Sequence, residues 1–451
     1  MTYKLRDVVT AIGGELIKGD PVVEIKGIST DTRTIAPGDL FFALIGENSD
    51  GHEYVQTAVE KGAAAVVVSK QVDTDSAIIL VPDTLIALGD LAALHRRQFR
   101  VRVVGITGSV GKTSTKEMVA AVLSSRYNVL KNAGNFNNEI GVPLTIFQLK
   151  PEHEILVQEM AMRLPGEIAE LAEIAKPDIG VITNIGVSHI ERLGTRDNIA
   201  AAKAELLESL SIDGIAVLNA DDPYFDFLSG KTAAGVVSYG ISSGNVQASN
   251  IRIDSMGRPS FKVKVGKSEF DVILPLPGEH NVPNALAAIA VGLCFGIPVK
   301  ESTAALASMV AADKRANVFD AAGGYKVFDD TYNASPASMI AALRTLAAME
   351  GKRKIAVLGD MKELGDYAVQ GHTEVGQEAV KSGLAMLVTV GELSRQIATS
   401  AREAGFAGEV RECETSDEAA EMLKSEVKPG DVVLAKGSRA MKMENIVEVL
   451  K

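Results

Sequence analysis

The sequence predicts an α/β protein of three domains, and three observations indicate this. The chain has 451 residues, more than one hydrophobic core usually organises. Short strands alternate with helices through residues 99–312, which is typical of a largely parallel sheet. A new strand–helix alternation begins near Asp313 and runs to the end of the chain. We therefore expect α/β domains over residues 1–98, 99–312 and 313–451, the last of them Rossmann-like.

Composition and charge favour a cytoplasmic globular protein. Apolar residues make up 46% of the chain, and 46 basic against 58 acidic residues give a net charge of −12. That charge disfavours nucleic acid or an anionic membrane as the main partner. Cys294 and Cys413 match no metal or redox spacing, which indicates a reducing compartment. The N-terminus has no apolar signal core, and residues 285–299 are too short an apolar run to span a membrane, so we expect no membrane insertion. We also expect a monomer.

A polar cluster precedes the predicted strand at residues 40–44. Ser29, Asp31 and Arg33 could hydrogen-bond a nucleotide or a sugar, with Arg33 facing a phosphate. A solvated turn with an Asx cap explains the same residues equally well.

Residues 101–115 have the pattern of strand, phosphate loop and helix. Four β-branched residues among the first six indicate a buried strand, a glycine-rich turn follows, and an amphipathic segment continues as a helix. Gly108 and Gly111 would let backbone N–H groups approach phosphate oxygens at the helix N-terminus. Lys112 would reach the outer phosphates, and Thr113 would offer a hydroxyl to magnesium.

This loop departs from the strict G-x-x-x-x-G-K-[ST] pattern, because Ile106 stands where that pattern has its first glycine. It is a G-S-x-G-K-T variant. The alternative is a chance glycine turn before a helix.

Two further strands of the central alternation end in polar groups. The apolar strand at residues 155–158 runs into Glu159, as expected of the acidic magnesium partner in phosphate-loop enzymes. The strand at residues 179–183 leads through N-I-G-V-S-H to His189. Ligands collect beyond the carboxyl ends of parallel strands, so we expect the phosphate loop, Glu159 and His189 to converge on one crevice.

A predicted helix over residues 197–210 places Lys203 within its apolar stripe, beside Ile199 and Leu206. One interpretation is a lysine whose stem lies on the apolar face while its amine reaches water. The other is that burial lowers the pKa of the amine and makes its neutral form reactive.

Residues 245–276 change pattern to a period of two, which predicts an antiparallel hairpin appended to the central domain. A buried helix ending near Gly296 follows. Asn281 and Asn284 lie one turn apart and could address a base edge or cap that helix. Capping alone is the favoured interpretation of Asn281.

The strand ends of the third predicted domain also carry polar strings: D-D-T-Y-N-A-S-P, G-D-M-K-E-L-G and K-G-S-R. Ser335 before Pro336 is a good helix start and explains part of the first string. It does not explain the paired Asp329 and Asp330.

Together with N-A-G-N-F-N-N-E-I-G-V-P at residues 132–143, these strings resemble the Mur ligases of bacterial peptidoglycan synthesis over essentially the whole chain. They look most like the member that joins D-Ala-D-Ala to UDP-MurNAc-tripeptide. The D-N-P-R box of the enzyme adding the third residue is absent. The missing glycine at position 106 is also the family's own pattern.

The resemblance implies an N-terminal UDP-sugar domain, a central ATPase domain and a C-terminal domain that closes over ATP and binds the dipeptide. The implied reaction makes UDP-MurNAc-pentapeptide, ADP and phosphate through an acyl phosphate. ATP and two magnesium ions would take part. Lys203 occupies the position of the family's carbamylated lysine, so we expect a carbamate there.

The resemblance also implies roles for individual residues. For catalysis it implies Lys112, His189, Lys203 and Lys362. For the nucleotide it implies Gly108, Ser109, Val110, Gly111, Lys112, Thr113, Ser114, Asn281, Asn284, Arg315 and Asp330. For the metal ions it implies Thr113, Glu159, His189 and Lys203. For the two other substrates it implies Ser29, Asp31, Arg33, Asn137, Asn138, Ser438 and Arg439.

Two alternatives remain open. One is another Mur-type ligase that joins a different amino acid or peptide, such as the third-residue ligase or a folylpolyglutamate synthase relative; the absent D-N-P-R box disfavours the first of these. The other is a phosphate-loop switch protein whose nucleotide state controls partner binding. Such a switch has no need of a carboxylate-activating site, so Lys203 in its apolar stripe disfavours it.

Overall fold

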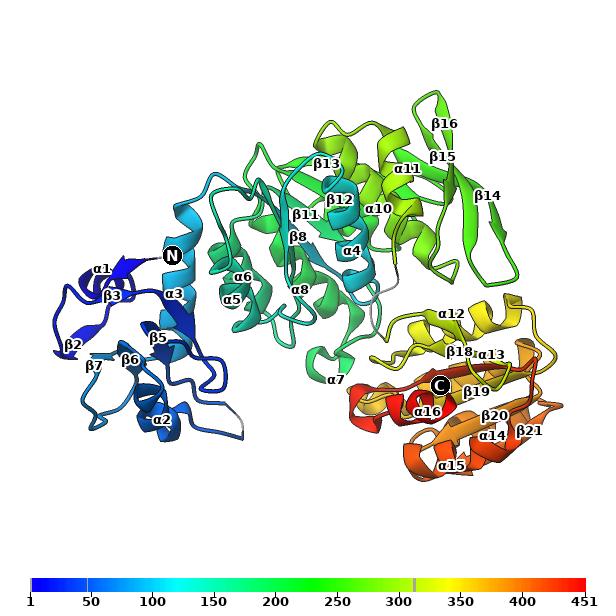
Figure 1. The fold of residues 1–451 in the computed structure, drawn as a ribbon. Coiled ribbons are helices and arrows are strands. Elements are labelled where there is room, and N and C mark those ends of the chain that lie inside the picture. The colour runs from blue at the N-terminus through cyan, green and yellow to red at the C-terminus, as the bar shows by residue number, and fades with distance from the viewer. Residues whose placement is uncertain (1, 47, 311–313) are drawn as a thin grey trace. The chain divides into compact units, whose positions relative to one another are not determined.

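The computed structural model describes residues 2–46, 48–310 and 314–451, and it confirms the predicted α/β class (Figure 1). The chain divides into two compact units. The first consists of Met1–Gly105, Asn128–Met162 and Gly166–Pro177, and the second of Ile106–Tyr127, Arg163–Pro165 and Asp178–Lys451. The expected boundary between residues 312 and 313 lies outside the described residues, and the one between residues 98 and 99 stays a prediction.

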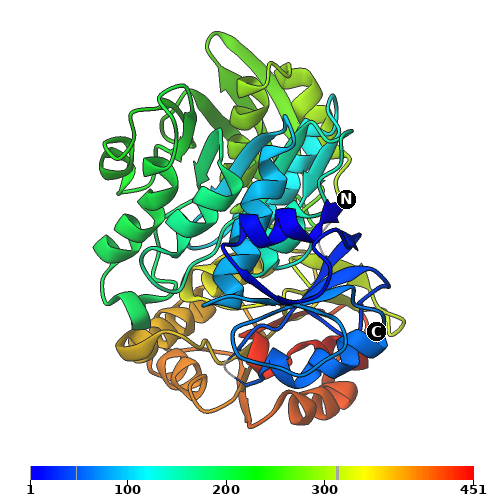
Figure 2. The ribbon, with the colours of Figure 1, turned by 90° about the vertical axis from the view of Figure 1, so that its left-hand side faces the viewer.

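The N-terminal part of the first unit is a five-stranded sheet in the order β2-β7-β6-β5-β4. Strands β4 to β7 are parallel, and β2 is antiparallel to β7. All four residues of β5 and all four of β6 are buried, because helices cover both faces: α1 and α3 pack on one face and α2 on the other (Figures 1 and 2). The elements are β1 (Tyr3–Lys4), α1 (Leu5–Ala11), β2 (Glu15–Lys18), β3 (Glu24–Ile25), β4 (Gly27–Ser29), β5 (Asp39–Phe42), η1 (Gly51–Tyr54), α2 (Val55–Glu60), β6 (Ala65–Val68), β7 (Ala77–Leu80) and α3 (Thr84–Arg97).

The rest of the first unit carries two parallel strands, β9 (Val129–Lys131) and β10 (Ile155–Glu159). Helices α5 (Gly141–Ile146) and α6 (Glu167–Ala175) accompany them. Strand β8 (Arg102–Thr107) begins in the first unit and ends in the second, so the phosphate loop that follows it belongs to the second unit.

The second unit begins with a parallel run, in which β11 pairs with β12, β12 with β13 and β13 with β14. Strands β14, β15 and β16 then pair antiparallel, which confirms the expected change of pattern at residues 245–276. These elements are α4 (Lys112–Leu123), β11 (Ile179–Ile182), α7 (Ile190–Leu193), α8 (Arg196–Glu208), β12 (Ile215–Asn219), α9 (Phe225–Ser229), β13 (Gly235–Gly240), β14 (Val246–Ile253), β15 (Pro259–Val265), β16 (Ser268–Ile273), α10 (Asn281–Cys294) and α11 (Val299–Ala307).

The C-terminal part of the second unit is a six-stranded sheet in the order β17-β18-β22-β19-β20-β21. It is parallel apart from β17, as expected of a Rossmann-like domain. Its elements are β17 (Asn317–Asp320), β18 (Lys326–Asp329), α12 (Pro336–Ala348), β19 (Lys354–Gly359), η2 (Gly365–Tyr367), α13 (Ala368–Lys381), β20 (Met386–Val390), α14 (Arg395–Glu403), β21 (Glu409–Cys413), α15 (Ser416–Glu426), β22 (Val432–Lys436), η3 (Arg439–Met441) and α16 (Glu444–Leu450).

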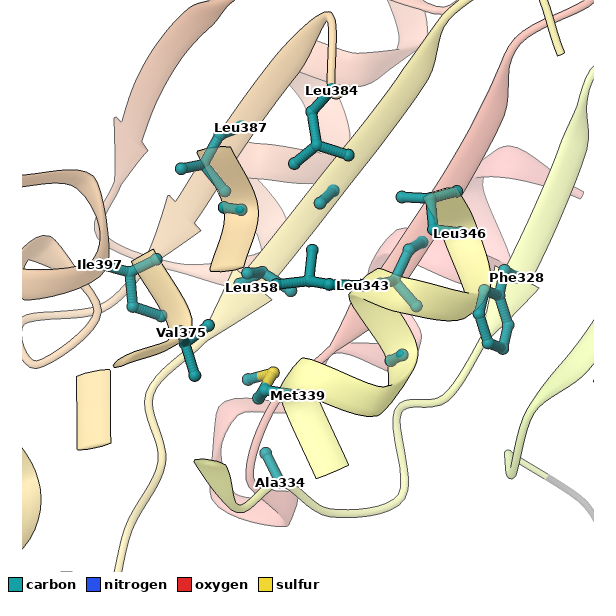
Figure 3. Close-up of a cluster of buried hydrophobic side chains, with 14 of the residues drawn as sticks. Phe328, Ala334, Met339, Leu343, Leu346, Leu358, Val375, Leu384, Leu387 and Ile397 are labelled. Carbon is teal, nitrogen blue, oxygen red and sulfur yellow. The ribbon is translucent and has the colours of Figure 1, made fainter. Parts of the chain in front are cut away.

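Two apolar clusters hold that sheet between its helices. On one face, side chains of α12, α13 and α14 meet Leu358, Leu387 and Phe328 of the strands (Figure 3). On the other face, α15 and α16 pack on the same strands. Ser335 caps α12 through a capping box with Ser338, which confirms the helix start expected there. None of the helices in the described ranges has the length and hydropathy of a membrane span.

Candidate functional site

The phosphate loop between β8 and α4 requires glycine at two positions. Gly108 has a φ of +148°, and a Cβ atom there would lie 1.9 Å from the hydroxyl oxygen of Thr183. Gly111 has a φ of +83°, and a Cβ atom would lie 2.7 Å from Oδ1 of Asn284. Gly111 precedes the first residue of α4 and supplies no side chain to cap it. The loop therefore brings backbone to a helix N-terminus, where the partial positive charge favours anions.

The segment after β11 fixes the shape of this loop. The amide N–H groups of Ser109 and Val110 donate to the backbone oxygen and to Oδ1 of Asn184, at 3.0 and 3.1 Å. The carbonyl of Val110 accepts from Thr183 Oγ1 at 2.6 Å and from Asn184 Nδ2 at 2.9 Å. The amide of Gly186 donates to Ser109 Oγ at 2.8 Å. Two polar residues directly after β11 thus fix the backbone conformation of the loop by hydrogen bonds.

Sequence reasoning singled out His189 in this stretch and missed Thr183 and Asn184. Their only signal was their place at the carboxyl end of a buried strand, which is where polar groups serve a ligand site. Nothing in the sequence indicates that their partner is the backbone of a loop more than 70 residues earlier.

Lys112 and the two asparagines of α10 surround the start of α4. The amine of Lys112 donates to the carbonyl of Gly108 at 2.9 Å, so it lies over the loop. Thr115 Oγ1 donates to Asn284 Oδ1 at 3.2 Å, and Asn284 Nδ2 donates to Asn281 Oδ1 at 3.1 Å. This places Asn284 beside the phosphate loop, with Asn281 behind it.

The capping interpretation of Asn281 is wrong. His280 is the N-cap residue of α10, and Asn281 lies in the first turn, where its Nδ2 reaches back to the carbonyl of Pro277 at 2.7 Å. Gly278, which has a φ of +101°, lies two residues before this N-cap.

Lys203 of α8 is buried, with 1% of its surface exposed. An amine that reached water would be exposed, so the structure excludes that interpretation of the apolar stripe. Burial lowers the pKa of the Lys203 amine well below its ordinary value, and the positive charge of Lys112 lowers it further. Within the residues that the structure describes, Lys203 has no ion-pair partner. Burial and the charge of Lys112 thus favour the neutral amine more than in an ordinary lysine.

His189 precedes α7 and adopts a left-handed conformation with a φ of +66°. Its Nδ1 lies 3.1 Å from Oε2 of Glu363, in the G-D-M-K-E-L-G string. The hydrogen bond from His189 lowers the pKa of the Glu363 carboxyl below its ordinary value. The residue before the histidine also contacts the phosphate loop, because the Ser188 hydroxyl donates to the carbonyl of Ser109 at 3.2 Å.

Glu159, in the first unit, ends β10 and is 2% exposed. Asn137 Nδ2 donates to its Oε1 at 2.8 Å, and its own amide donates to Asn132 Oδ1 at 2.8 Å. Asn138 Oδ1 accepts from the amide of Gly141 at 3.0 Å, at the start of α5. The structure thus brings Asn137 to Glu159. The convergence of Glu159 with residues of the second unit stays a prediction.

The strand ends of the C-terminal sheet bring Lys362 and Ser438 together. The amide of Lys362 donates to Ser438 Oγ at 2.9 Å, and the Lys362 amine lies 2.8 Å from Oδ2 of the buried Asp360. Arg439 follows and pairs with Glu444 at 2.6 Å. One lysine, one hydroxyl and one guanidinium therefore lie within two neighbouring loops.

The paired aspartates at the end of β18 have different partners. Asp329 accepts from the hydroxyl of Thr331 at 2.7 Å, whereas Asp330 lies 2.5 Å from the amine of Lys436, which is 3% exposed. The guanidinium of Arg315 lies 4.0 Å from the centre of the Tyr332 ring, as in a cation–π contact.

The N-terminal cluster has the geometry of the Asx turn that was the alternative interpretation. Asp31 Oδ1 accepts from the Arg33 amide at 2.8 Å, and the Arg33 guanidinium lies 2.6 Å from Asp31 Oδ2. These hydrogen bonds lower the pKa of the Asp31 carboxyl. Ser29 Oγ donates to the Asp31 carbonyl at 2.9 Å. The Arg33 side chain is 87% exposed and so remains accessible to a ligand.

In the described ranges, no group of three histidine, cysteine, aspartate or glutamate side chains could hold a metal ion alone. Magnesium in nucleotide enzymes is usually held by one or two protein groups together with phosphate oxygens. The hydroxyl of Thr113 and the carboxylate of Glu159 are oxygen donors of the kind that magnesium prefers.

Comparisons with known proteins cover nearly the whole chain. Residues 24–108 match the Mur ligase family catalytic domain, residues 106–292 the Mur ligase middle domain, and residues 314–439 the Mur ligase glutamate ligase domain. The UDP-N-acetylmuramoyl-tripeptide–D-alanyl-D-alanine ligase of Bacillus subtilis is 38% identical over 97% of this chain and 96% of its own length. The enzyme of that name from Escherichia coli is 37% identical over 100% of this chain and 99% of its own length.

Solved structures give the same result. A crystal structure of MurF from Acinetobacter baumannii superimposes with a TM-score of 0.93 at 33% identity, covering 100% of this chain and 99% of that one. MurF ligase from Thermotoga maritima in complex with ADP superimposes with a TM-score of 0.83 at 32% identity, covering 94% and 97%. Identity above 30% over nearly all of both chains leaves one conclusion, that this chain belongs to the Mur ligase family.

Proposed function

We propose that the chain is the ATP-dependent ligase that adds D-alanyl-D-alanine to UDP-MurNAc-tripeptide and so makes UDP-MurNAc-pentapeptide for peptidoglycan. One observation carries this proposal: the relatives named for that reaction are similar to this chain from end to end. We further propose that it works as a monomer in the cytoplasm. Residues 1–98 would bind the UDP-sugar, residues 99–312 ATP, and residues 313–451 the dipeptide.

The reaction has to make a carboxylate electrophilic. A carboxylate oxygen of the tripeptide attacks the γ-phosphorus of ATP, the bond to the bridging oxygen breaks, and ADP leaves. The dipeptide amine then attacks the acyl carbon, phosphate leaves, and the nitrogen loses a proton as the amide forms. Both steps gather negative charge on phosphate oxygens, which calls for fixed positive groups around them.

The phosphate loop supplies those groups. The start of α4 presents N–H groups and partial positive charge, and the Lys112 amine lies over the loop, 2.9 Å from the Gly108 carbonyl. Ser109, Val110 and Ser114 belong to the same loop and first helical turn. The hydrogen bonds between this loop and residues Thr183 and Asn184 fix its shape, and a site fixed in this way needs little reorganisation when ATP binds.

The residues present fit magnesium as the cofactor. Thr113 and Glu159 would hold one ion, and His189 with a carbamate on Lys203 a second. When bound, the ions would neutralise phosphate charge and polarise the phosphoryl oxygen.

Lys203 is suited to carry that carbamate. A neutral amine can add carbon dioxide and release a proton, which turns a neutral side chain into an anion. The burial that lowers the pKa of Lys203 favours the amine form that reacts. The nearby positive charge of Lys112 would then attract the product.

The remaining substrate roles rest on the resemblance. Lys362 would reach the reacting phosphate after the C-terminal domain closes, and Ser438 and Arg439 would hold the dipeptide. Asn281 and Asn284 would face the adenine, Asp330 the ribose and Arg315 a phosphate. Ser29, Asp31 and Arg33 would face the UDP group, and Asn137 and Asn138 would lie between the two substrate regions.

A related ligase for another amino acid or peptide is the second candidate. Folylpolyglutamate synthase of Mycobacterium tuberculosis shares the fold at a TM-score of 0.64 and 18% identity. The test is incubation with ATP, UDP-MurNAc-tripeptide and D-Ala-D-Ala, with mass detection of the pentapeptide. We expect that product together with one ADP and one phosphate. If it is absent while another amino acid is joined, the second candidate is correct.

A further inference from the structure

The loop between β19 and η2 contacts the turn that begins α7. Oε2 of Glu363 lies 3.1 Å from Nδ1 of His189. The same turn touches the loop a second time, two residues later. A Cβ atom on Gly365 would lie 3.0 Å from Cβ and Cγ of Glu191, so a larger residue at this position would crowd α7.

The backbone on both sides of the contact is unusual. Glu363 and His189 have φ angles of +64° and +66°, in the left-handed region that non-glycine residues rarely adopt. Gly365 has a φ of +51°. Such conformations persist where the surroundings hold them, and they gather at ligand sites and switch regions. Here they turn the two side chains of one ion pair toward each other.

The stem of the loop is fixed from within the C-terminal sheet. The carboxylate of Asp360 is 2% exposed and accepts from the Ser394 amide at 2.8 Å. The amide of Met361 donates to His372 Nε2 at 3.1 Å, and the amide of Lys362 donates to Ser438 Oγ at 2.9 Å. Three successive residues before Glu363 are thus held by partners, so the loop presents its carboxylate from a rigid base.

The ion pair between Glu363 and His189 contributes little to folding stability. The Glu363 side chain is 64% exposed, and exposed ion pairs contribute little to the free energy of folding. A histidine that binds a metal, in contrast, commonly donates its other ring N–H to a carboxylate, which fixes the tautomer and the ring orientation. The contact has that arrangement, with Nδ1 on the carboxylate and Nε2 left for another ligand.

We propose that Glu363 is a positioning residue for His189: its carboxylate holds the hydrogen on Nδ1 and so presents the Nε2 lone pair to the metal. This rests on the proposed function, in which His189 is a magnesium ligand. The loop that carries Glu363 also carries Lys362, the lysine expected to reach the reacting phosphate. When this loop contacts α7, it therefore both places the Lys362 amine for the phosphate and orients the metal ligand His189.

The first readout needs neither metal nor activity. The imidazole ¹⁵N shifts of His189, assigned with a His189→Gln variant, report which nitrogen carries the hydrogen in the ligand-free protein at a pH where the ring is neutral. We expect the Nδ1–H tautomer in the wild type, a mixture in Glu363→Ala, and recovery of the Nδ1–H form in Glu363→Gln, whose amide oxygen still accepts. Asp366→Asn removes an exposed carboxylate three residues further on and should leave the shifts unchanged.

The second readout is Mn²⁺ affinity in the presence of ADP, measured by electron paramagnetic resonance. Loss of the carboxylate should weaken binding about 10-fold, with Asp366→Asn as the matched control. Unchanged His189 shifts and unchanged Mn²⁺ affinity in Glu363→Ala would overturn the proposal. If the wild type makes no pentapeptide, the proposed function fails, whereas the tautomer result still decides whether Glu363 orients His189.

Discussion

At the scale of single residues, Lys203 departs furthest from its ordinary chemistry. Its apolar stripe predicted a lysine on a buried face, and the structure places it at 1% exposure. The helical period could predict this because residues three and four positions apart share one face of a helix. Thr183 and Asn184 could not be predicted in the same way, because their partners are backbone groups of a distant loop.

We expect Lys203→Ala to lower ligation by roughly 100-fold or more, since a group that stabilises charge in the reaction is lost. The measurement is pentapeptide formation at saturating ATP. Added bicarbonate should not rescue the variant, because alanine has no amine to modify. Lys231→Ala, which removes an exposed lysine paired with Glu208, is the control and should keep wild-type activity. Substantial ligation by Lys203→Ala would refute the role of Lys203.

His95 of α3 leads to a prediction about pH and stability. Burial lowers the pKa of His95 to about 4, from an ordinary 6.5. Between those values the unfolded chain binds a proton that the folded protein does not, so stability falls as the pH drops below 6.5. At pH 5 this loss amounts to about 2 kcal/mol.

Urea unfolding at pH 7.5 and pH 5 measures that loss. His95→Gln should lose about 2 kcal/mol less than the wild type between the two pH values. His153→Gln, at a partly exposed histidine in the same unit, should follow the wild type. Equal losses in the wild type and His95→Gln would contradict the assignment to His95.

At the scale of elements, hydrogen bonds join the phosphate loop to the end of β11. The pattern of residues 101–115 predicted a strand, a glycine turn and a helix, and the structure has the strand at Arg102–Thr107 and the helix at Lys112–Leu123. The start of α10 was less predictable. Asparagine is a common N-cap residue type, but in the structure Asn281 lies in the first turn and His280 takes the N-cap position.

Gly108→Ala tests the loop as an element. The new Cβ would lie 1.9 Å from Thr183 Oγ1, so either the loop or the end of β11 must move. We expect ADP affinity, measured by calorimetry, to fall by at least about 10-fold, because the backbone donors of the loop shift. Gly296→Ala is the matched control, with a positive φ of +71° and no neighbour within 4 Å of the new atom. It should lose about 1 kcal/mol of stability and no ADP affinity. Wild-type ADP affinity in both variants would disprove the steric account.

At the scale of the whole molecule, the order of the motifs was enough to predict the α/β class and the family. The antiparallel strands at residues 245–276 and the parallel C-terminal sheet also follow from local periodicity. The division into units could not be predicted. It depends on which distant segments pack together, and the period of a strand or helix carries no such information.

If the nucleotide site is completed only when the C-terminal groups reach it, ATP alone should be hydrolysed slowly. We expect phosphate release from ATP, followed by a coupled fluorescence assay, to be at least about 10-fold slower than with both other substrates present. Addition of UDP-MurNAc-tripeptide alone serves as the control for partial loading. Brisk phosphate release from ATP alone would count against this coupling.

The way the chain runs through its two units also constrains its synthesis. The first unit contains residues from three separate stretches, the last of which ends at Pro177, and the segment 106–127 between them belongs to the other unit. A nascent chain therefore cannot complete its first unit until residue 177 has left the ribosome, although translation of that unit began at residue 1. The amphipathic helix α4 in the segment 106–127 contacts α10 and α11, which are synthesised later still, so we expect chaperones to reach α4 until those helices emerge.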